Sequence, residues 1–265
     1  MKKERLDEAL VRLQYADTPE LARAIIMEGR VFQNGNRLDK PAILLASDVG
    51  LTVKGDKLPY VSRGGLKLEK AIAAFGLTFE GKTCMDVGSS TGGFTDCMLQ
   101  KGAQKVYAVD VGYGLLDWKL RNDPRVVVME RTNARLLNPE MTGGERMDFA
   151  SMDVSFISIR TVLPAVRTCM KENAHLAVLV KPQFEARREQ VGKGGIVRDP
   201  KVHREVLETV IAAMPAIGLV PQGLTVSPIK GVGGNTEFLL HLTNTELNGT
   251  AFQAERAIED VLRFV

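Results

Sequence analysis

The chain has 265 residues, of which 45% are hydrophobic and 25% are charged. This length and composition fit one large globular domain or two unequal ones, and they exclude a disordered or fibrous protein. With 35 basic and 32 acidic residues the formal charge is only +3, so any basic surface for a nucleic acid has to be local.

Cysteine usage and apolar runs indicate the compartment. The cysteines stand far apart, at positions 84, 97 and 169, without a CxxC pair or a histidine at ligand spacing. We therefore expect no disulfide framework, no bound metal and a reducing, cytoplasmic compartment. The charged start MKKERLDEALVRL lacks the apolar core of a signal peptide, and a proline and a glycine break the most apolar run, Val210–Val220. We expect no membrane partner.

The first part of the chain is predicted to form two short helices followed by strands. Leu6, Leu10 and Leu13 lie at positions i, i+4 and i+7, which predicts one amphipathic helix. A second helix is expected between an N-cap at Thr18 and a left-handed C-cap at Gly29. Strands are then predicted at Val31–Gln33, before an Asn34–Gly35 turn, and at Val49–Val53.

Four arginines in this part could form a basic surface. Arg5 and Arg12 are seven residues apart, as are Arg23 and Arg30, so each pair is expected on one face of its helix. A plainer interpretation is that the arginines are solvated and pair with neighbouring glutamates, namely Glu8, Glu20 and Glu28. The charge pattern leaves both interpretations open.

The segment from Arg5 to Ala42 resembles the S4-type RNA-binding domain, in which two helices and a following hairpin form an RNA-binding surface. The resemblance covers nearly all of residues 1–57, and it implies that the four arginines contact RNA. Residues 58–61 are predicted to be a linker, because Pro59 holds its predecessor in an extended conformation.

Residues 62–265 alternate strand-like runs with helical ones, which is typical of a doubly wound, Rossmann-like α/β domain with a parallel sheet. Its parallel strands are predicted at Thr83–Val87, Lys105–Val109, Val126–Glu130, Asp148–Val154 and His175–Val180. A last pair of runs, Gly223–Ile229 and Glu237–Leu242, is expected as an antiparallel hairpin at the sheet edge. The tail from Ala251 to Val265 is predicted to be helical.

The sharpest motif is DVGSSTGGFTD at residues 86–96, a glycine-rich loop between a buried strand and a helix. A dinucleotide loop would read Gly-x-Gly-x-x-Gly, whereas this loop begins with an acid and spaces its glycines differently. A carboxylate repels phosphates but suits a cationic ligand, so S-adenosyl-L-methionine is the predicted cofactor. The expected contacts in the loop are Asp86, Gly88, Ser89, Ser90, Gly92, Gly93 and Phe94.

Two polar residues beyond the loop extend this prediction. Asp110 follows the second predicted strand, where its carboxylate could accept hydrogen bonds from a ribose diol. Asn133 comes after the third strand and could meet the adenine amine. A glycine-rich turn without a ligand and the NAD site of an oxidoreductase are the alternatives.

Asp153 and Lys181 each lie at the end of a predicted strand, and both strand ends face the same crevice. A lysine directly after the apolar run Leu176–Val180 is costly to bury unless an acid pairs with it, so a structural ion pair is one interpretation. Lys67 and Glu237, taken singly, fit solvated surface charges. Only the four residues together suggest a shared site.

Lys67, Asp153, Lys181 and Glu237 resemble the Lys-Asp-Lys-Glu tetrad of the FtsJ-like ribose 2′-O-methyltransferases. With the S4-type part, nearly the whole chain resembles the TlyA (hemolysin A) family of rRNA methyltransferases, through the motifs YVSRGGLK, DVGSSTGGFTD, DVSFIS, VKPQFE and GNTEF. The resemblance implies methylation of ribosomal RNA or ribosomal subunits, with S-adenosyl-L-methionine as methyl donor and these four residues as the catalytic set.

A ribose 2′-hydroxyl is a poor nucleophile, so a base has to take its proton. Lys181 is the expected base, since burial and the cation of Lys67 favour its neutral form, although Asp153 favours the charged form. Lys67 and Glu237 are expected to orient Lys181 and the hydroxyl. The glycine-rich segment Val191–Val197 could be a mobile lid or a passive loop.

Two other functions stay open. The chain could bind RNA through an inactive methyltransferase fold, which the intact tetrad argues against. It could also be a membrane-active hemolysin, as the family name suggests. Direct lysis needs an amphipathic or apolar insertion element, and the sequence offers none of adequate length.

Overall fold

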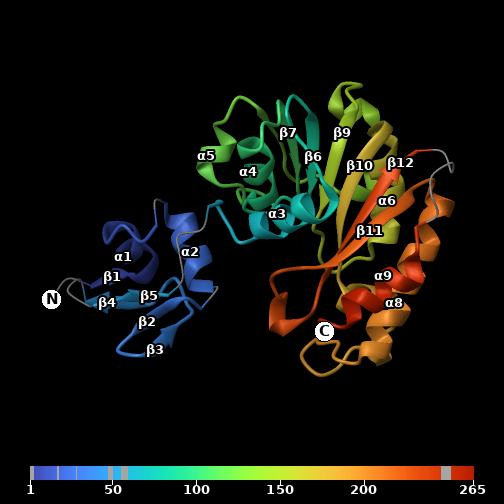
Figure 1. Ribbon diagram of the computed structural model, residues 1–265. Helices are drawn as coiled ribbons and strands as arrows, with labels where there is room; N and C mark the ends of the chain where they lie inside the picture. Colours follow the sequence, from blue (N-terminus) through green and yellow to red (C-terminus); the bar gives the residue numbers. More distant parts are fainter. Residues whose placement is uncertain (1–2, 17, 28, 47–49, 55–58, 246–251) are drawn as a thin grey trace. The chain divides into compact units, whose positions relative to one another are not determined.

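The computed structural model describes residues 3–16, 18–27, 29–46, 50–54, 59–245 and 252–265 (Figure 1). The chain forms two compact units, Met1–Arg63 and Gly64–Val265, and each has its own apolar core. The predicted domain end at residue 57 and the first residue of the predicted linker lie outside the described residues.

The small unit combines short helices with short strands. Its elements are β1 (Lys3–Arg5), α1 (Leu6–Arg12), α2 (Pro19–Met27), β2 (Val31–Gln33), β3 (Asn36–Leu38), β4 (Leu44–Ala46) and β5 (Thr52–Val53). β1 pairs with β4, while β3, β2 and β5 form an antiparallel sheet in that order. Leu6 and Leu10 of α1 are buried against Ile25 and Ile26 of α2 and against Val31.

Local sequence explains most of these elements. Pro19 begins α2, and Gly29 takes the left-handed conformation just after it, with φ +70°. Asn34 and Gly35 have φ of 49° and 81°, as a tight hairpin turn between β2 and β3 requires. Both predicted helices and this hairpin are confirmed. The predicted strand Val49–Val53 begins outside the described residues, and β5 is its described part.

The large unit is built on a seven-stranded sheet. Its strands are β6 (Thr83–Val87), β7 (Lys105–Val109), β8 (Val126–Met129), β9 (Met147–Met152), β10 (Met170–Val180), β11 (Val220–Val226) and β12 (Phe238–Asn244). The order across the sheet is β11-β12-β10-β9-β6-β7-β8, and β12 runs antiparallel to both of its neighbours. The other neighbouring pairs are parallel, so the doubly wound sheet and its edge hairpin are confirmed.

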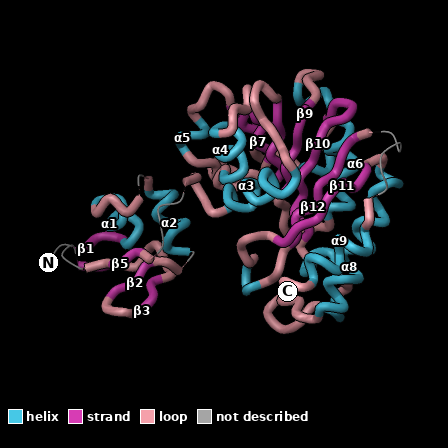
Figure 2. The backbone as a smooth tube through the Cα atoms, viewed as in Figure 1, coloured by secondary structure: helices cyan, strands magenta, loops and turns pink. Residues whose placement is uncertain are grey.

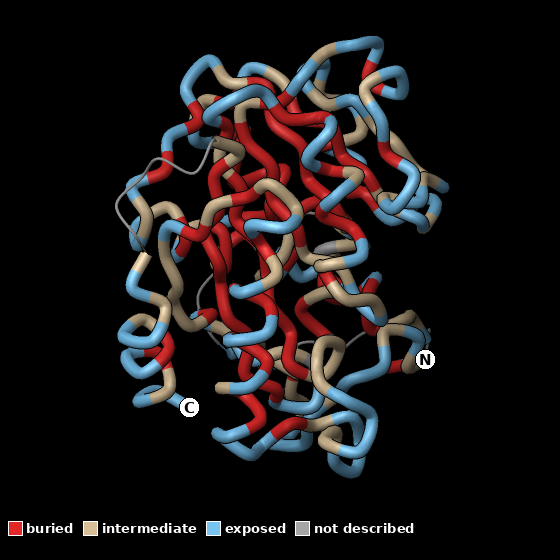
Figure 3. Tube along the Cα trace, turned by 90° about the vertical axis from the view of Figure 1, so that its right-hand side faces the viewer, coloured by how far each residue is buried: buried red, intermediate tan, exposed pale blue. Residues whose placement is uncertain are grey.

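Helices cover both faces of this sheet (Figures 1 and 2). α3 (Gly64–Phe75) and α4 (Gly93–Gln100) pack on one face, whereas α6 (Ile159–Thr168), α8 (Pro200–Ile217) and α9 (Ala254–Leu262) pack on the other. The loops hold short helical turns, which are α5 (Trp118–Arg121), η1 (Ala134–Leu136), η2 (Pro139–Thr142), α7 (Pro182–Glu185), η3 (Arg188–Gln190) and η4 (Val232–Gly234). Buried residues concentrate in the strands between the helical layers (Figure 3).

The strand β10 differs most from its predicted bounds. It begins at Met170 rather than at His175, because Met170 already pairs with Met147 of β9 before a register shift. The other strands end within a few residues of their predicted limits, which is the usual uncertainty of element boundaries. The predicted terminal helix is confirmed as α9, although residues 246–251 lie outside the described part of the chain.

Candidate active site

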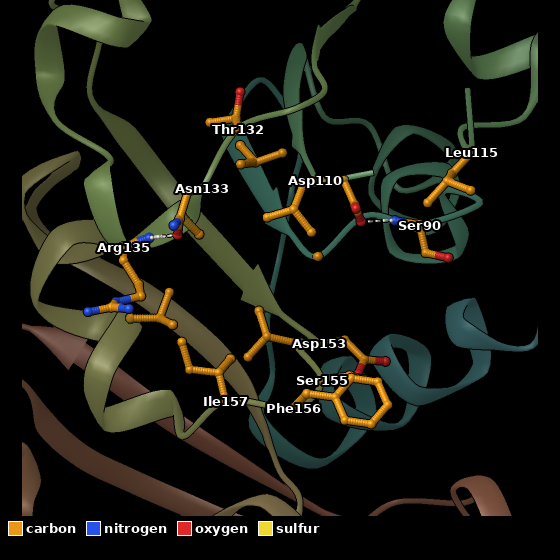
Figure 4. A pocket seen from close by; sticks show the side chains of 16 residues that line it. Ser90, Asp110, Leu115, Thr132, Asn133, Arg135, Asp153, Ser155, Phe156 and Ile157 are labelled. Atoms are coloured by element: carbon orange, nitrogen blue, oxygen red, sulfur yellow. Dashed lines mark hydrogen bonds between the residues drawn. The ribbon is translucent and has the colours of Figure 1, made fainter. Parts of the chain in front are cut away.

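The strand order reverses between β6 and β9, and a pocket of about 430 Å³ lies at the carboxyl ends of these strands (Figure 4). Such a reversal point is where ligands bind in doubly wound sheets. Four of the predicted cofactor residues line this pocket together with one member of the predicted tetrad. They are Gly88, Ser90, Asp110 and Asn133, with Asp153.

Asp110 follows β7 directly, and two backbone donors fix its carboxylate. Ser90 N donates to Oδ2 at 2.8 Å, and Gly112 N donates to Oδ1 at 2.7 Å. Each carboxylate oxygen has a second lone pair, so Asp110 can still accept hydrogen bonds from a ligand.

Asn133 stands on the opposite wall of the pocket in Figure 4. Its Oδ1 accepts a hydrogen bond from Arg135 N at 3.1 Å, which caps η1 and fixes the orientation of the amide. Apolar side chains complete the pocket wall, and they include Val109, Val111, Leu115, Ile157 and Val162.

The glycine-rich loop lets the ends of β6 and β9 approach closely. A Cβ on Gly88 would lie 2.6 Å from the backbone oxygen of Asp153, and Gly88 also has φ +82°. This position therefore requires glycine. Of the predicted loop contacts, Gly88 and Ser90 line the pocket, whereas the structure does not bring the others to its wall, namely Asp86, Ser89, Gly92, Gly93 and Phe94.

Asp86 lies behind the loop, where it joins three elements. Its Oδ2 accepts hydrogen bonds from Thr95 N at 3.0 Å and Thr95 Oγ1 at 2.7 Å, and its Oδ1 accepts one from Ser151 Oγ at 3.0 Å. Thr95 belongs to α4 and Ser151 to β9. Burial raises the pKa of Asp86 to about 6. Asp86 thus shapes the loop from within the protein.

The four predicted tetrad residues meet at the same edge of the sheet. Lys67 of α3 donates from Nζ to Asp153 Oδ2 at 3.1 Å and to Glu237 Oε2 at 2.9 Å. Lys181 Nζ lies 2.5 Å from Asp153 Oδ1, so the predicted pair of Asp153 with Lys181 is confirmed. Asp153 bridges the two lysines. Glu237 contacts Lys67, which in turn contacts Asp153, the partner of Lys181.

Ion pairing outweighs burial in this cluster. Burial lowers the pKa of Lys67, but the carboxylates of Asp153 and Glu237 raise it above its ordinary value overall. Burial likewise raises the pKa of Asp153, but Lys67 and Lys181 hold it below its ordinary value. Lys67 therefore stays a cation and Asp153 an anion near neutral pH.

Glu237 depends on the glycine-rich turn before β12. A Cβ on Gly231 would lie 2.2 Å from Glu237 Oε1, so a larger residue there would displace the carboxylate. Asn235 of the same turn accepts a hydrogen bond from Val197 N at 3.0 Å and donates to Gly195 O at 2.9 Å. The segment 191–197 is thus tied to this turn in the described conformation, which favours the passive loop among the two interpretations.

Sequence reasoning missed two residues beside the tetrad. Ser155 Oγ accepts a hydrogen bond from Lys181 Nζ at 3.0 Å. Phe156 is 91% exposed, has φ +63° and lines the pocket, and its ring centroid lies 5.1 Å from that of Phe184. Both residues belong to the DVSFIS motif, but a serine and a phenylalanine in a loop carry no distinctive signal by themselves.

The expectation that the small unit's arginines share two helical faces is wrong. Arg5 ends β1 instead of lying in α1, and Arg30 lies beyond the end of α2, next to β2. Arg30 Nε donates to the backbone oxygen of Lys54 at 2.7 Å. A spacing of seven residues predicts a common face only while the helix continues, and here each pair extends past a helix end.

The arginines are paired, but mostly with other partners than those expected. Arg5 and Arg23 both bind the buried Asp7, at 2.8 Å and 3.0 Å, and Arg12 binds Glu4. Arg23 also lies 3.9 Å from Glu20, one of the expected partners. The side chains of the three paired arginines remain 42–49% exposed.

Neither a metal centre nor a membrane span is found in the described residues. No group of at least three His, Cys, Asp or Glu side chains among them could hold a metal ion. Within the same part of the chain, no helix combines the length and the apolar character needed to cross a bilayer. Cys84, Cys97 and Cys169 are buried and form no disulfide.

Two family models match the chain. The FtsJ-like methyltransferase model matches residues 60–244, and the S4 domain model matches residues 4–48. The chain is 57% identical over 241 residues to the "Putative rRNA methyltransferase YqxC" of Bacillus subtilis, covering 91% of this chain and 86% of that protein. It is 44% identical over 259 residues to the "16S/23S rRNA (cytidine-2'-O)-methyltransferase TlyA" of Mycobacterium tuberculosis, covering 97% and 96% of the two chains.

A solved structure agrees with these matches over the full length. The "Putative hemolysin" of Streptococcus thermophilus superposes with a TM-score of 0.79 at 47% identity, covering 100% of this chain and 96% of that one. The fold, the tetrad and the relatives all lead to the same assignment. The chain belongs to the FtsJ-like methyltransferases and, with its S4 domain, to the TlyA (hemolysin A) family.

Proposed function

We propose that this protein methylates a ribose 2′-hydroxyl of ribosomal RNA and that it takes the methyl group from S-adenosyl-L-methionine. The observation that carries this proposal is the ion-paired cluster of Lys67, Asp153, Lys181 and Glu237 at the edge of the pocket. The M. tuberculosis relative is named for cytidine 2′-O-methylation of 16S and 23S rRNA, so a cytidine ribose is the first substrate to test.

The pocket residues fit this methyl donor. The Asp110 carboxylate suits the ribose diol of the donor, and the Asn133 amide suits its adenine amine. Apolar neighbours such as Val111 and Leu115 suit the face of the adenine ring. Gly88 lines the pocket and lets the backbone of Asp153 come close to the glycine-rich loop. The remaining predicted loop contacts would support this wall from behind, namely Asp86, Ser89, Gly92, Gly93 and Phe94.

Lys181 is the residue we propose as general base. Lys67 contacts two carboxylates, whereas Lys181 contacts the one carboxylate that it shares with Lys67 and the hydroxyl of Ser155. When bound, the methyl donor supplies an electrophilic methyl on a sulfonium. Neutral Lys181 Nζ accepts the 2′-hydroxyl proton as the ribose oxygen takes the methyl, and Asp153 then stabilises the ammonium that forms. Glu237 holds Lys67 in place.

The small unit would supply affinity for RNA. A guanidinium has five N–H donors, so Arg5, Arg12 and Arg23 can bind a phosphate while keeping contacts with Asp7 and Glu4. Arg30 would act in the same way beside β2. Binding through phosphates should weaken with added salt. Ribosomal RNA or a ribosomal subunit as the partner would fit a cytoplasmic enzyme.

The experiment that tests this function uses rRNA from a strain that lacks the protein. The purified chain is incubated with this rRNA and labelled S-adenosyl-L-methionine, and modified positions are mapped by resistance to alkaline hydrolysis, which a 2′-O-methyl group confers. We expect labelled, alkali-resistant positions with the parent chain and none with Lys181→Ala. Label without alkali resistance would indicate base methylation and contradict the proposal.

A further inference from the structure

Glu185 is a buried carboxylate that the mechanism above does not use. It ends α7, and its side chain is only 2% exposed. Its Oε1 accepts a hydrogen bond from Ile159 N at 2.7 Å, and its Oε2 accepts one from Ser158 Oγ at 2.6 Å. Arg160 Nε lies 3.4 Å from the same Oε2. All three donors lie at the beginning of α6.

These contacts join the two segments that carry the central pair of the tetrad. Residues 153–158 lead from β9 into α6 and carry Asp153 and Ser155, while α7 directly follows Lys181. Lys181 Nζ lies 2.5 Å from Asp153 Oδ1 and 3.0 Å from Ser155 Oγ. Polar contacts therefore tie the two segments at two places, once through the reacting lysine and once through Glu185.

The backbone between the two ties is in a conformation that needs support. Phe156 has φ +63°, which lies in the left-handed region that side chains other than glycine rarely adopt. Such a conformation persists only where surrounding contacts hold it. Phe156 as a whole is 91% exposed, and its ring centroid lies 5.1 Å from that of Phe184 of α7, so little else covers this residue. Glu185 is the buried anchor next to this bend.

We propose that Glu185 is a positioning residue of the methyl-transfer site, which holds the start of α6 and thereby sets where Asp153 and Ser155 stand relative to Lys181. This inference rests on the proposed function. The carboxylate satisfies donors at the amino end of α6, where the helix dipole also favours a negative charge. Without Glu185 the 153–158 segment loses its second tie, and small displacements of reacting groups lower rates steeply.

The test compares Glu185→Ala and Glu185→Gln with the parent in the full chain. Methyl transfer is measured on rRNA from a strain lacking the protein, and amide hydrogen exchange is measured at Ile159. We expect Glu185→Ala to lower kcat by roughly tenfold to a hundredfold, with KM for the methyl donor within about twofold of the parent. Exchange at Ile159 should become faster. Glu185→Gln keeps one acceptor for Ile159 N, so its kcat and its exchange rate at Ile159 should lie between those of the parent and those of Glu185→Ala.

Two further variants separate positioning from general destabilisation. Glu145 is a control for loss of a hydrogen-bonded carboxylate away from the site, because its side chain, which is 35% exposed, accepts hydrogen bonds from Thr83 of β6 and from Lys105 and Tyr107 of β7. Glu145→Gln should leave kcat unchanged. Ser158→Ala removes one partner of Glu185 and also the N-cap hydrogen bond that Ser158 Oγ accepts from Arg160 N. Because the contact between Ser158 and Glu185 is shared, the double variant with Glu185→Ala should lose less kcat than the two single losses multiplied together.

The outcomes are distinct. Unchanged exchange at Ile159 in Glu185→Ala overturns the inference, as does faster exchange with a parental kcat. An equal loss of kcat in Glu145→Gln overturns it too, because the loss would then follow from stability. A parent chain that does not methylate ribose contradicts the proposed function itself, and this is recognised before any variant is compared.

Discussion

Each unit of this protein buries an aspartate almost completely, and the pKa values of the two carboxyl groups are shifted in opposite directions. Asp7 of the small unit and Asp86 of the large unit are both 1% exposed. Hydrogen bonding to Arg5, with a further contact from Arg23, lowers the pKa of Asp7 to about 2. Burial raises the pKa of Asp86 to about 6, because its hydroxyl and amide donors are neutral.

The comparison shows that the direction of the pKa shift depends on which effect is larger: burial prevails at Asp86, and hydrogen bonding to a charged guanidinium prevails at Asp7. In the small unit, guanidinium groups that remain half exposed hold Asp7. In the large unit, neutral donors hold Asp86 behind the pocket, and charged groups gather in the tetrad at its edge. In our proposal the first arrangement serves binding of a polyanion and the second serves proton transfer. Five predictions test this division of binding and catalysis between the small and the large unit.

Removing residues 1–57 should have the largest effect. We expect the remaining chain to show no detectable methylation of full-length rRNA, because the phosphate contacts of the small unit are lost. Affinity for S-adenosyl-L-methionine, measured by calorimetry, should be unchanged, since the pocket lies in the large unit. Full activity of the shortened chain on rRNA would refute the division of labour.

Replacing Lys181 should be the most damaging single change. We expect Lys181→Ala to lower the single-turnover rate by at least about a hundredfold, which is typical for loss of a general base, with donor affinity little changed. Lys181→Arg should be nearly as slow, since a guanidinium cannot accept a proton at useful pH. If Lys181 only forms a structural ion pair with Asp153, the arginine variant keeps the charge and stays active. A rate above about a tenth of the parent would favour that role.

Asp110→Ala should weaken binding of the methyl donor by roughly tenfold or more, because a hydrogen bond to a charged group contributes about 1.5–3 kcal/mol. Calorimetric titration of the isolated chain measures this directly. Asp110→Asn is the milder comparison, since its amide oxygen can still accept from Ser90 N. Binding by Asp110→Ala within about twofold of the parent would show that the carboxylate does not contact the donor.

Asp7→Asn should destabilise the small unit by about 2 kcal/mol, because it removes the charge that two arginines share. Amide exchange in α1 reports this unit separately from the large one. The pKa of Asp7 is lowered in the folded state, from 3.8 to about 2. Its stabilising contribution is therefore complete above about pH 4 and is lost as the pH falls through 2. The difference between parent and variant should vanish in acid.

Asp86→Asn should be the least damaging of these changes, because its partners are neutral and an amide can replace several contacts. The pH dependence of stability has the opposite sign for Asp86 and for Asp7. A pKa raised from 3.8 to about 6 makes the folded state most favourable below pH 3.8 and costs stability as the pH rises through 6. The free energy of unfolding of Asp86→Asn should therefore rise relative to that of the parent as the pH increases from 3.8 to about 6. Fluorescence of the single tryptophan, Trp118, follows unfolding of the large unit.

The tetrad shows how far the site could be predicted from the sequence. The position of Asp153 and Lys181 at one edge of the sheet could be predicted, because each residue lies at the end of an apolar run that forms a strand. Parallel strands bring their carboxyl ends together. Lys67 and Glu237 required the family resemblance, since each fits a solvated charge. The partners of Lys67 could not be predicted, because Lys67 meets its two acids across 86 and 170 residues of chain.

By itself the sequence determined the features that local chemistry encodes. These are the α/β class of the large unit, the strand ends, the glycines that only a close approach or a left-handed turn explains, and the motifs of both families. Only the tertiary structure decided that Asp86 lies behind the pocket, that Arg5 belongs to a strand and that Glu185 anchors α6. The reason is that the partner of a buried side chain comes from whichever element the sheet order places beside it, and a local pattern does not contain that neighbour.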